Sequence, residues 1–223
     1  SPDALHTRAS VETENLIVSM PDSGVRVEGI SGAIDIADLL SFRTEPHQKL
    51  SFASASLGAV PVDGGTLAFQ VESPRQVFLE KAEFDWCGGH LTSHAVRFSP
   101  QTPDFDLVIY AHEVEVDQVL HLLEGFRGAA RGALYGRLPL RFDDGRLSYS
   151  DGFLYSVPGE GGSLEMENRQ LLTGNLPENH PNFERLRMAE KALQDFNYEY
   201  FKLDFSGTGS TDTSLRLRLA GKA

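Results

Sequence analysis

This chain of 223 residues has little cysteine, few positive charges and no long apolar runs. Its single cysteine, Cys87, excludes an internal disulfide framework. Twenty lysines and arginines stand against 32 aspartates and glutamates, for a formal net charge of −12. Without a dense cationic face, neither a nucleic-acid backbone nor an anionic membrane surface is an expected partner. No stretch approaches the roughly 18 consecutive apolar residues that a membrane-spanning helix requires.

Alternating strands joined by tight turns are what the chain does have, most clearly over residues 128–166. Large apolar side chains occupy every second position of residues 138–142 and again of residues 147–149. This period-2 pattern is typical of a sheet with one dry face. Asp144-Gly145 lies between the two runs, and Asp-Gly supplies the positive φ that a tight hairpin needs. The sequence therefore predicts a β-meander here.

The N-terminal half reads as a series of strands and turns. Residues 1–24 are expected to form a polar leader or an edge strand, and residues 25–40 indicate two short strands separated by glycine. Asp63-Gly64-Gly65 and Cys87-Gly88-Gly89 predict hairpin turns. We expect Cys87 to be buried and unpaired, because it follows an apolar strand end.

Two stretches change to helical periodicity. Asp117 is expected to cap a short helix that ends at Gly125. Residues 181–197 predict a longer helix, with an apolar stripe running from Phe183 to Phe196. The stripe indicates that this helix packs across one end or face of the sheet.

The predicted fold class is mainly β, with roughly a dozen antiparallel strands and one short and one longer α-helix, in a single β-rich domain over 1–223. Because the helices interrupt runs of strands rather than alternating with single strands, the order excludes a doubly wound nucleotide-binding fold. The chain begins at Ser1 rather than at a methionine and stops as a strand ends. We therefore expect it to be the excised C-terminal part of a larger protein.

The residues that carry chemistry in enzymes do not combine into a site. Cys87 and His90 are three apart, but glycines reverse the chain between them and no third polar group is nearby to orient the histidine. His90 and His94 lie on one strand face about 13 Å apart, too far for a shared metal ion. We predict no catalytic residue, no metal ligand and no cofactor.

The apolar face of the long strands has no second β-layer of matching length to cover it. The sheet's own curl, another copy or domain, or an apolar ligand would each fill this face. The composition and spacing of the residues leave these three open.

The ordered set of motifs resembles the AsmA-like bacterial envelope proteins, and most closely the YdbH-type branch, whose terminal domain carries the name "dicarboxylate transport". The resemblance is carried by VEGISGAIDIADLLS, HQKLSFASASLGAVPVDGGTLAFQV, FDWCGGHLTS, VDQVLHLLEG, GALYGRLPLRFDDGRLSYSDGFLYSVPGEGGSLEM, ALQDFNYEYFKLDF and SLRLRLAGK, in this order. Residues 1–15 and the GTGSTDT connector depart from the family pattern. A net charge of −12 fits poorly with dicarboxylate transport.

The resemblance implies a long twisted antiparallel sheet curled into an open, taco-like groove. It further implies a non-catalytic part of a periplasm-spanning protein that is anchored in the inner membrane of a Gram-negative bacterium and carries phospholipids towards the outer membrane. The partners expected on this basis are phospholipid or other acyl chains, the remainder of the same long chain and other envelope proteins. Candidate groove residues alternate with polar or small neighbours: Leu67, Phe69, Phe84, Trp86, Leu138, Leu140, Phe142, Leu147 and Tyr149.

A different class of function stays open beside this one. A structural or adhesive β-module would bind a protein or glycan through an edge strand or through exposed aromatics such as Tyr110, Tyr135 and Tyr155. A concave face that is polar and aromatic favours a glycan, whereas a uniformly aliphatic one favours lipid.

Overall fold

The structure, a computed structural model, describes residues 7–20, 24–57, 60–102, 104–123, 126–143, 146–167, 173–174, 177, 179–192, 194–208 and 212–222. The strands are β1 (Ala9–Met20), β2 (Val25–Asp38), β3 (Arg43–Thr44), β4 (Gln48–Leu57), β5 (Val60–Ser73), β6 (Gln76–Trp86), β7 (Gly89–Phe98), β8 (Phe105–Glu115), β9 (Gly128–Arg131), β10 (Ala133–Asp143), β11 (Arg146–Tyr155), β12 (Gly162–Met166), β13 (Phe196–Thr208) and β14 (Asp212–Lys222). The helices are α1 (Val116–His121) and α2 (Phe183–Ala192).

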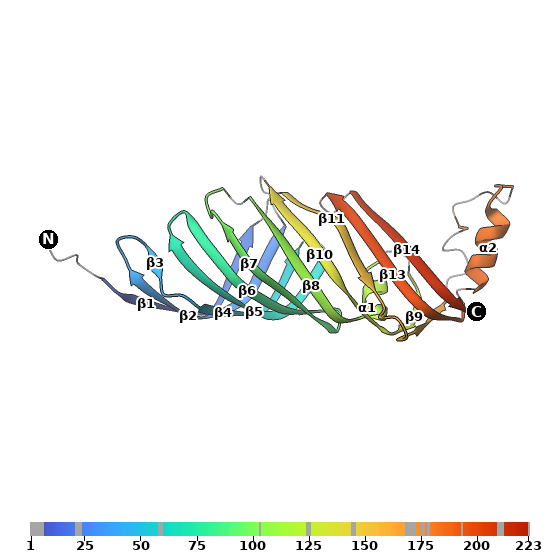
Figure 1. Ribbon diagram of the computed structural model, residues 1–223, viewed down its shortest axis with the longest axis horizontal. Coiled ribbons are helices and arrows are strands. Elements are labelled where there is room, and N and C mark those ends of the chain that lie inside the picture. The colour runs from blue at the N-terminus through green and yellow to red at the C-terminus, as the bar shows by residue number, and fades with distance from the viewer. Residues whose placement is uncertain are drawn as a thin grey trace.

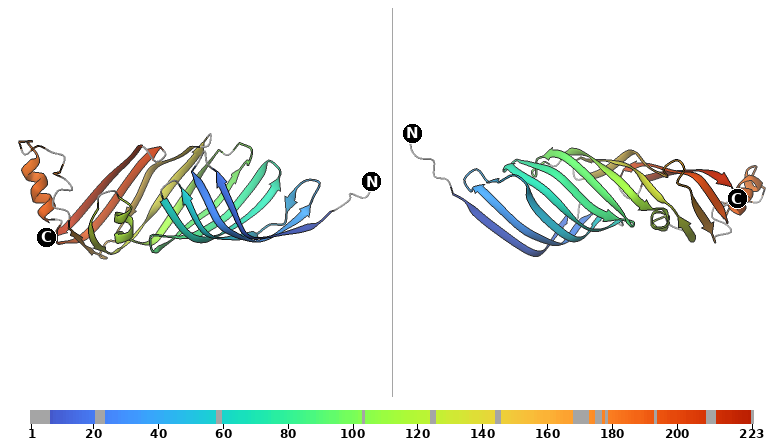
Figure 2. Two further views of the ribbon diagram at one scale, coloured as in Figure 1. Left: turned by 180° about the vertical axis from the view of Figure 1, so that it is seen from behind. Right: turned by 60° about the horizontal axis from the view of Figure 1, so that its bottom comes forward.

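All of these strands belong to one 14-stranded antiparallel sheet, in the order β1-β2-β4-β5-β6-β7-β8-β10-β11-β13-β12-β9. In addition, β3 pairs with β2 and β14 pairs with β13. The sheet is long and twisted and curls into an open groove, with the N-terminal strands forming the wall opposite β7 to β11 (Figures 1 and 2). This confirms the predicted fold class.

Short hairpins explain most of the strand order. Trp86 pairs with Gly89, so Cys87 and Gly88 form a two-residue loop, with φ of 48° and 72°. Positive φ at both positions is what a type I′ hairpin turn requires, which confirms the predicted turn. Asp143 pairs with Arg146 across the hairpin of β10 and β11. The Asp144-Gly145 turn itself lies outside the described residues.

The C-terminal third departs from simple hairpin order. One edge of β13 pairs with β14 over its whole length, and its other edge is shared by β11 and β12. The short strand β9 pairs with β12, and α1 connects β8 to this corner of the sheet. The Asp117 carboxylate accepts a hydrogen bond from the Ala130 amide at 2.8 Å, which fastens α1 to β9. Loop lengths alone do not predict this arrangement, because the pairing is non-local.

Three expectations about the elements were wrong. Residues 25–38 form one strand, which runs through Gly29 and Gly32 instead of stopping between them. Asp63-Gly64-Gly65 lies inside β5 rather than in a turn, and there the glycines make room for the neighbouring strands. The N-cap of α1 is Glu115, and Asp117 instead belongs to the first turn.

The longer helix is also shorter than predicted. It ends at Ala192, Leu193 lies outside the described residues, and Phe196 begins β13. Helix α2 lies beyond the β14 end of the sheet and does not cross its face (Figure 1). Its one buried residue among those described is Glu190, whose carboxylate accepts hydrogen bonds from the Thr173 amide and hydroxyl. No helix in the described ranges is long and apolar enough to span a membrane.

The residues expected as an edge strand do form one. Among the described residues, strand β1 pairs with β2 alone and is the first strand of the sheet order. Residues 1–6 and 21–23 of the predicted leader lie outside the described residues.

Candidate functional site

A row of directly opposed residues crosses nine strands on one face of the sheet. Each member pairs with the next, from β4 to β14, and no member is polar: Phe52, Gly65, Phe84, Leu91, Ala111, Gly136, Leu154, Leu203 and Leu217. We call this set the apolar row. With strands about 4.8 Å apart, its eight steps span roughly 38 Å across the sheet.

A second row runs beside the first on the same face. Leu50, Leu67, Ala82, Ser93, Ile109 and Leu138 are paired in turn from β4 to β10. Its one polar member, Ser93, is fully buried, and its hydroxyl donates to the Val108 carbonyl at 2.8 Å. Because that hydroxyl is satisfied internally, the row stays apolar towards the groove.

Part of this face is closed by the chain itself. Helix α1 buries Val116, Val119 and Leu120 against the lower ends of β8 to β13, on the side seen from behind in Figure 2. In the same core cluster, Leu134 and Phe201 have no exposed surface. This end of the concave face is therefore a dry core.

The rest of the face stays accessible. Phe52, Phe84 and Leu138 are only partly buried. Leu217, the last member of the apolar row, is 42% exposed, and Val11 on the opposite edge strand is 51% exposed. Large apolar side chains are thus left open to solvent at both edges of the sheet.

The structure places the predicted groove residues as follows. Phe84, Trp86, Leu138 and Leu140 pack against the core cluster as partly buried residues. Leu67 is opposite Ala82, and Phe69 is opposite Leu79 beyond a register shift in β5 and β6.

The remaining three candidates lie towards the upper ends of β10 and β11. Leu140 pairs with Tyr149, whose ring lies 6.3 Å from that of Phe205. Phe142 stacks on Phe105 at 5.5 Å between ring centroids. The backbone of Leu147 pairs with Phe142, but its side chain lies outside the described part of the chain.

Several residues of this face were missing from the predicted set. They include Leu50, Phe52, Leu91, Ile109, Leu154, Leu203, Phe205 and Leu217. In the sequence, Leu215, Leu217 and Leu219 alternate with Arg216 and Arg218, a pattern that predicts one shared face for the three leucines. What was missing was the register, since a shift of one residue moves a side chain to the other face.

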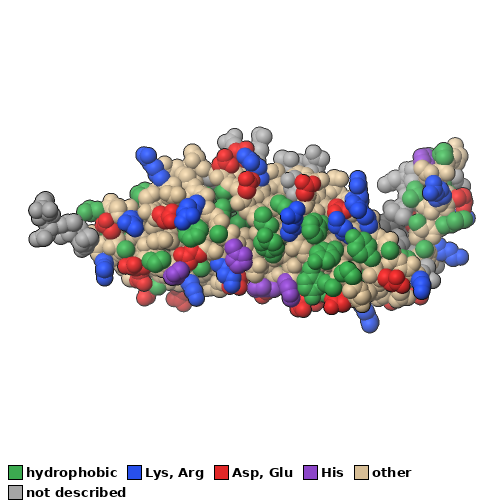
Figure 3. Space-filling view, in the orientation of Figure 1, with side chains coloured by type: hydrophobic (Ala, Val, Ile, Leu, Met, Phe, Trp, Pro, Cys, Tyr) green, Lys and Arg blue, Asp and Glu red, His purple; other side chains and the backbone are tan. Residues whose placement is uncertain are grey.

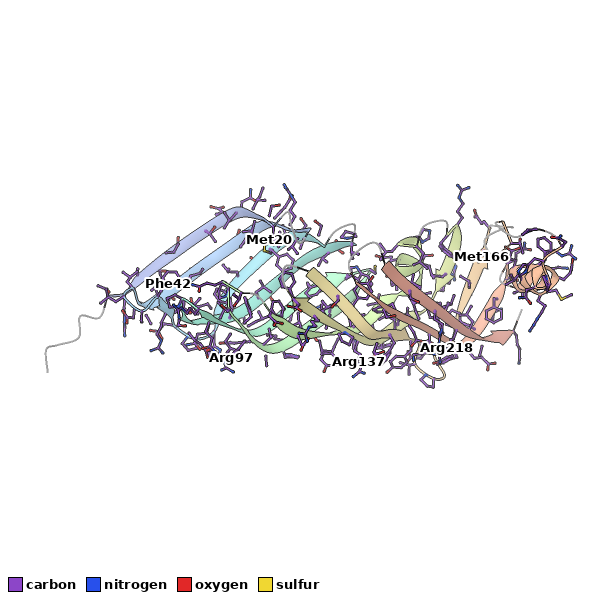
Figure 4. All side chains as sticks on the ribbon, turned by 90° about the horizontal axis from the view of Figure 1, so that it is seen from above. Met20, Phe42, Arg97, Arg137, Met166 and Arg218 are labelled. Atoms are coloured by element: carbon purple, nitrogen blue, oxygen red, sulfur yellow. The ribbon has the colours of Figure 1, made fainter. Side chains whose placement is uncertain are left out.

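The opposite, convex face carries both charged side chains and an apolar patch (Figure 3). Arg97, Arg137 and Arg218 project from this side (Figure 4). Arg97 binds the Glu72 carboxylate at 3.1 Å, and Lys81 binds Glu83 at 2.6 Å. Figure 3 looks onto this face and shows charged side chains spread along its length, with hydrophobic side chains gathered over β8, β10 and β11.

Cys87 and His90, the pair weighed as a nucleophile and its base, are placed unfavourably for that role. Cys87 is 8% exposed, and burial, reinforced by the Asp63 and Glu115 carboxylates, raises the pKa of its thiol to about 12. The Cys87 thiol is therefore protonated at neutral pH and a poor nucleophile. His90 lies on the convex face, with Nδ1 3.1 Å from the Asp85 carboxylate.

Comparison with known proteins gives a family. A family model described as "YdbH-like: Intermembrane phospholipid transport protein YdbH" matches residues 7–223. No curated protein matches the chain. No solved structure matches it either. The match covers nearly the whole sequence and agrees with the curled sheet and its apolar concave face. The chain belongs to the YdbH-like family of intermembrane phospholipid transport proteins.

Proposed function

We propose that this chain is a non-catalytic segment of a periplasm-spanning carrier and that it holds phospholipid acyl chains on its concave face. The full-length protein would be anchored in the inner membrane of a Gram-negative bacterium and pass lipid between the inner and outer membranes. Family membership supports the transport of phospholipid. The position of the acyl chains, the absence of catalysis and the anchor are our inference.

The apolar row is the observation that carries this proposal. The chain itself covers the middle of the row, because Leu91, Ala111, Leu154 and Leu203 are buried. The β4 to β6 end of the row is more accessible, since Phe52 and Phe84 are only partly buried there. An acyl chain is therefore expected at the β4 to β6 end of this face, where Leu50, Leu67 and Phe69 are also only partly buried. Each CH₂ that it buries contributes about 0.8 kcal/mol, so about ten carbons supply on the order of 8 kcal/mol before the entropic cost of binding.

The shape of the sheet suits transfer rather than storage. A groove that is open along one side leaves the polar head group in water, so its hydration need not be lost. The rows include no charged residue, and Ser93 satisfies its hydroxyl internally. Neither row therefore offers a directional contact that would select one lipid. A lipid that slides along the groove breaks no hydrogen bond with either row.

Site-specific photocrosslinking in the full-length protein in its native envelope tests this proposal. A photoreactive residue at Phe69 or Leu140 should capture phospholipid, as detected by mass spectrometry. Ala68 and Arg141 are matched controls, because each is adjacent in sequence to a test position and points to the opposite face. Equal capture at all four positions, or none at Phe69 and Leu140, would show that the concave face is only a hydrophobic core.

The alternative of an adhesive β-module has one observation in its favour. Tyr110 is 52% exposed on the convex face, and Tyr135 and Tyr155 lie on the neighbouring strands. Exposed aromatic rings stack on sugars or on a partner protein. Reproducible hits on a glycan array that are lost in Tyr110→Ala would favour this alternative.

A further inference from the structure

Four cationic side chains gather on the convex face of an otherwise strongly acidic chain. Strands β10, β11, β13 and β14 surround a hollow of about 420 Å³ there, lined by Arg137, Lys202, Arg216 and Arg218 together with Asp151 and Asp204. The formal local charge is +2, whereas that of the whole chain is −12. Basic side chains over β13 and β14 are visible in Figure 3.

The carboxylates of the hollow do not saturate these cations. Asp204 Oδ1 lies 2.7 Å from Lys202 Nζ, and Oδ2 lies 3.0 Å from the Arg218 guanidinium without hydrogen-bond geometry. Within the described part of the chain, Arg137 forms no ion pair. Arg216 is directly opposite Asp204 across β13 and β14 but forms no ion pair with it within 4.0 Å. Two guanidinium groups therefore retain free donors beside the hollow.

The arrangement also places like charges against each other. Lys202 and Arg218 are directly opposite across β13 and β14, and like charges in that position destabilise a sheet. Two of the cations are also brought together by Phe153, because Arg137 and Lys202 both lie over its ring, at 5.5 and 4.9 Å. An anion in the hollow would relieve the repulsion between these cations.

We propose that this hollow binds a phosphate group. A guanidinium presents its donors in a planar fork that matches two oxygens of a tetrahedral oxyanion, and three of the four cations are arginines. The hydroxyls of Ser206 and Ser214 also line the hollow and add neutral donors. A free phosphate ester and a phospholipid head group present the same group to these residues.

The phosphate site is independent of acyl-chain binding in the groove. Phe153 points into the hollow, whereas Leu154, the next residue, is a buried member of the apolar row on the other face. The sheet therefore separates the two sites. A phosphate bound here does not belong to a lipid whose tails lie on the concave face directly behind it.

The test compares two double variants of equal charge. Arg137→Gln with Arg216→Gln removes the two guanidinium groups without ion pairs. Arg185→Gln with Arg187→Gln removes two exposed charges from α2, away from the hollow. Calorimetric titration at low ionic strength with inorganic phosphate and with glycerol 3-phosphate should show saturable binding that the first pair weakens about tenfold or more and the second leaves within about twofold.

A vesicle arm distinguishes the two sources of phosphate. The protein is sedimented with phosphatidylglycerol vesicles. If glycerol 3-phosphate competes with this vesicle binding, and if the Arg137/Arg216 glutamine variant no longer binds the vesicles, the hollow binds a lipid head group. Titration with the soluble esters alone assigns a free phosphate. Arg137→Lys with Arg216→Lys should retain part of the affinity, which separates loss of charge from misfolding.

Three outcomes would overturn the proposal. In the first, no phosphate probe binds saturably beyond the binding of chloride at equal ionic strength. In the second, the α2 control variant weakens phosphate binding as much as the Arg137/Arg216 glutamine variant does. In the third, the Arg137/Arg216 glutamine variant binds phosphate as well as the unaltered chain.

Discussion

The ring of Phe52 lies over Gly65, with its Cζ atom 2.7 Å from the position where a β-carbon at residue 65 would stand. The Phe84 Cβ lies 2.6 Å from the same position. Three adjacent strands thus bring two aromatic residues together over a glycine, and the apolar row depends on this close approach.

Gly65→Ala is expected to destabilise the fold by about 1–3 kcal/mol or more, because the added methyl group meets the backbone carbonyl oxygen of Glu83 first and then Phe84 and Phe52. Urea denaturation measures the change. Thr66→Ala, at the next and exposed position, should stay within about 0.5 kcal/mol. Adding Phe52→Leu to Gly65→Ala should recover part of the loss, and strict additivity would contradict the proposed contact.

Leu154→Ala and Leu217→Ala should differ strongly although both residues belong to the apolar row. Leu154 is 1% exposed, so its truncation leaves a cavity and should cost about 2–5 kcal/mol. Leu217 is 42% exposed, and its truncation should cost less than about 1 kcal/mol. Thermal and urea unfolding of the two variants compare the values. Equal costs would mean that the accessible end of the face is as tightly packed as the core.

The Cys87 thiol should resist alkylation in the native protein. Burial first, and then the Asp63 and Glu115 carboxylates, raise its pKa to about 12, so little thiolate is present at pH 8. A maleimide or iodoacetamide time course should show slow reaction in buffer and rapid, stoichiometric reaction in urea. Complete native labelling within minutes would contradict the buried position.

Asp204 should contribute to stability at neutral pH and lose that contribution in acid. The hydrogen bond from Lys202 holds the pKa of this carboxyl below its ordinary value, burial acts in the opposite direction, and Arg218, Lys202 and Arg216 reinforce the lowering. A carboxyl whose pKa is lower in the folded state stabilises that state above its unfolded pKa of about 3.9. The stabilisation disappears as pH falls through the folded pKa.

Asp204→Asn therefore should be less stable than the unaltered chain at pH 7. The gap between the two should narrow progressively below about pH 4, as measured by urea denaturation across the range. Asp85→Asn is a suitable control, because this carboxylate is 66% exposed and should change little. A gap that stays constant down to the lowest pH would show that the Asp204 charge does not carry the effect.

The sequence by itself determined the mainly β class, the hairpin at Cys87-Gly88 and the existence of both helices. These features follow from local chemistry. The spacing of apolar residues over 138–149 marks a dry face, and a two-residue Cys87-Gly88 loop forces its strands to pair. A 3.6-residue period favours a helix, although Phe196, the last residue of the predicted stripe, begins β13. The resemblance to the YdbH-type family also came from the sequence, because the motifs occur in the family's order and no single motif is specific.

Only the tertiary structure decided which side chains share the concave face and what covers them. From the local sequence, Gly64 and Gly65 are equally compatible with a turn and with a close approach between strands. The contact of Gly65 with Phe52, thirteen residues away, decides for the close approach. Register shifts in β10 and β11 determine that Leu154 rather than Phe153 faces the groove. Pairing of β12 with both β9 and β13 closes one end of that groove, because it joins segments whose contacts no local pattern encodes.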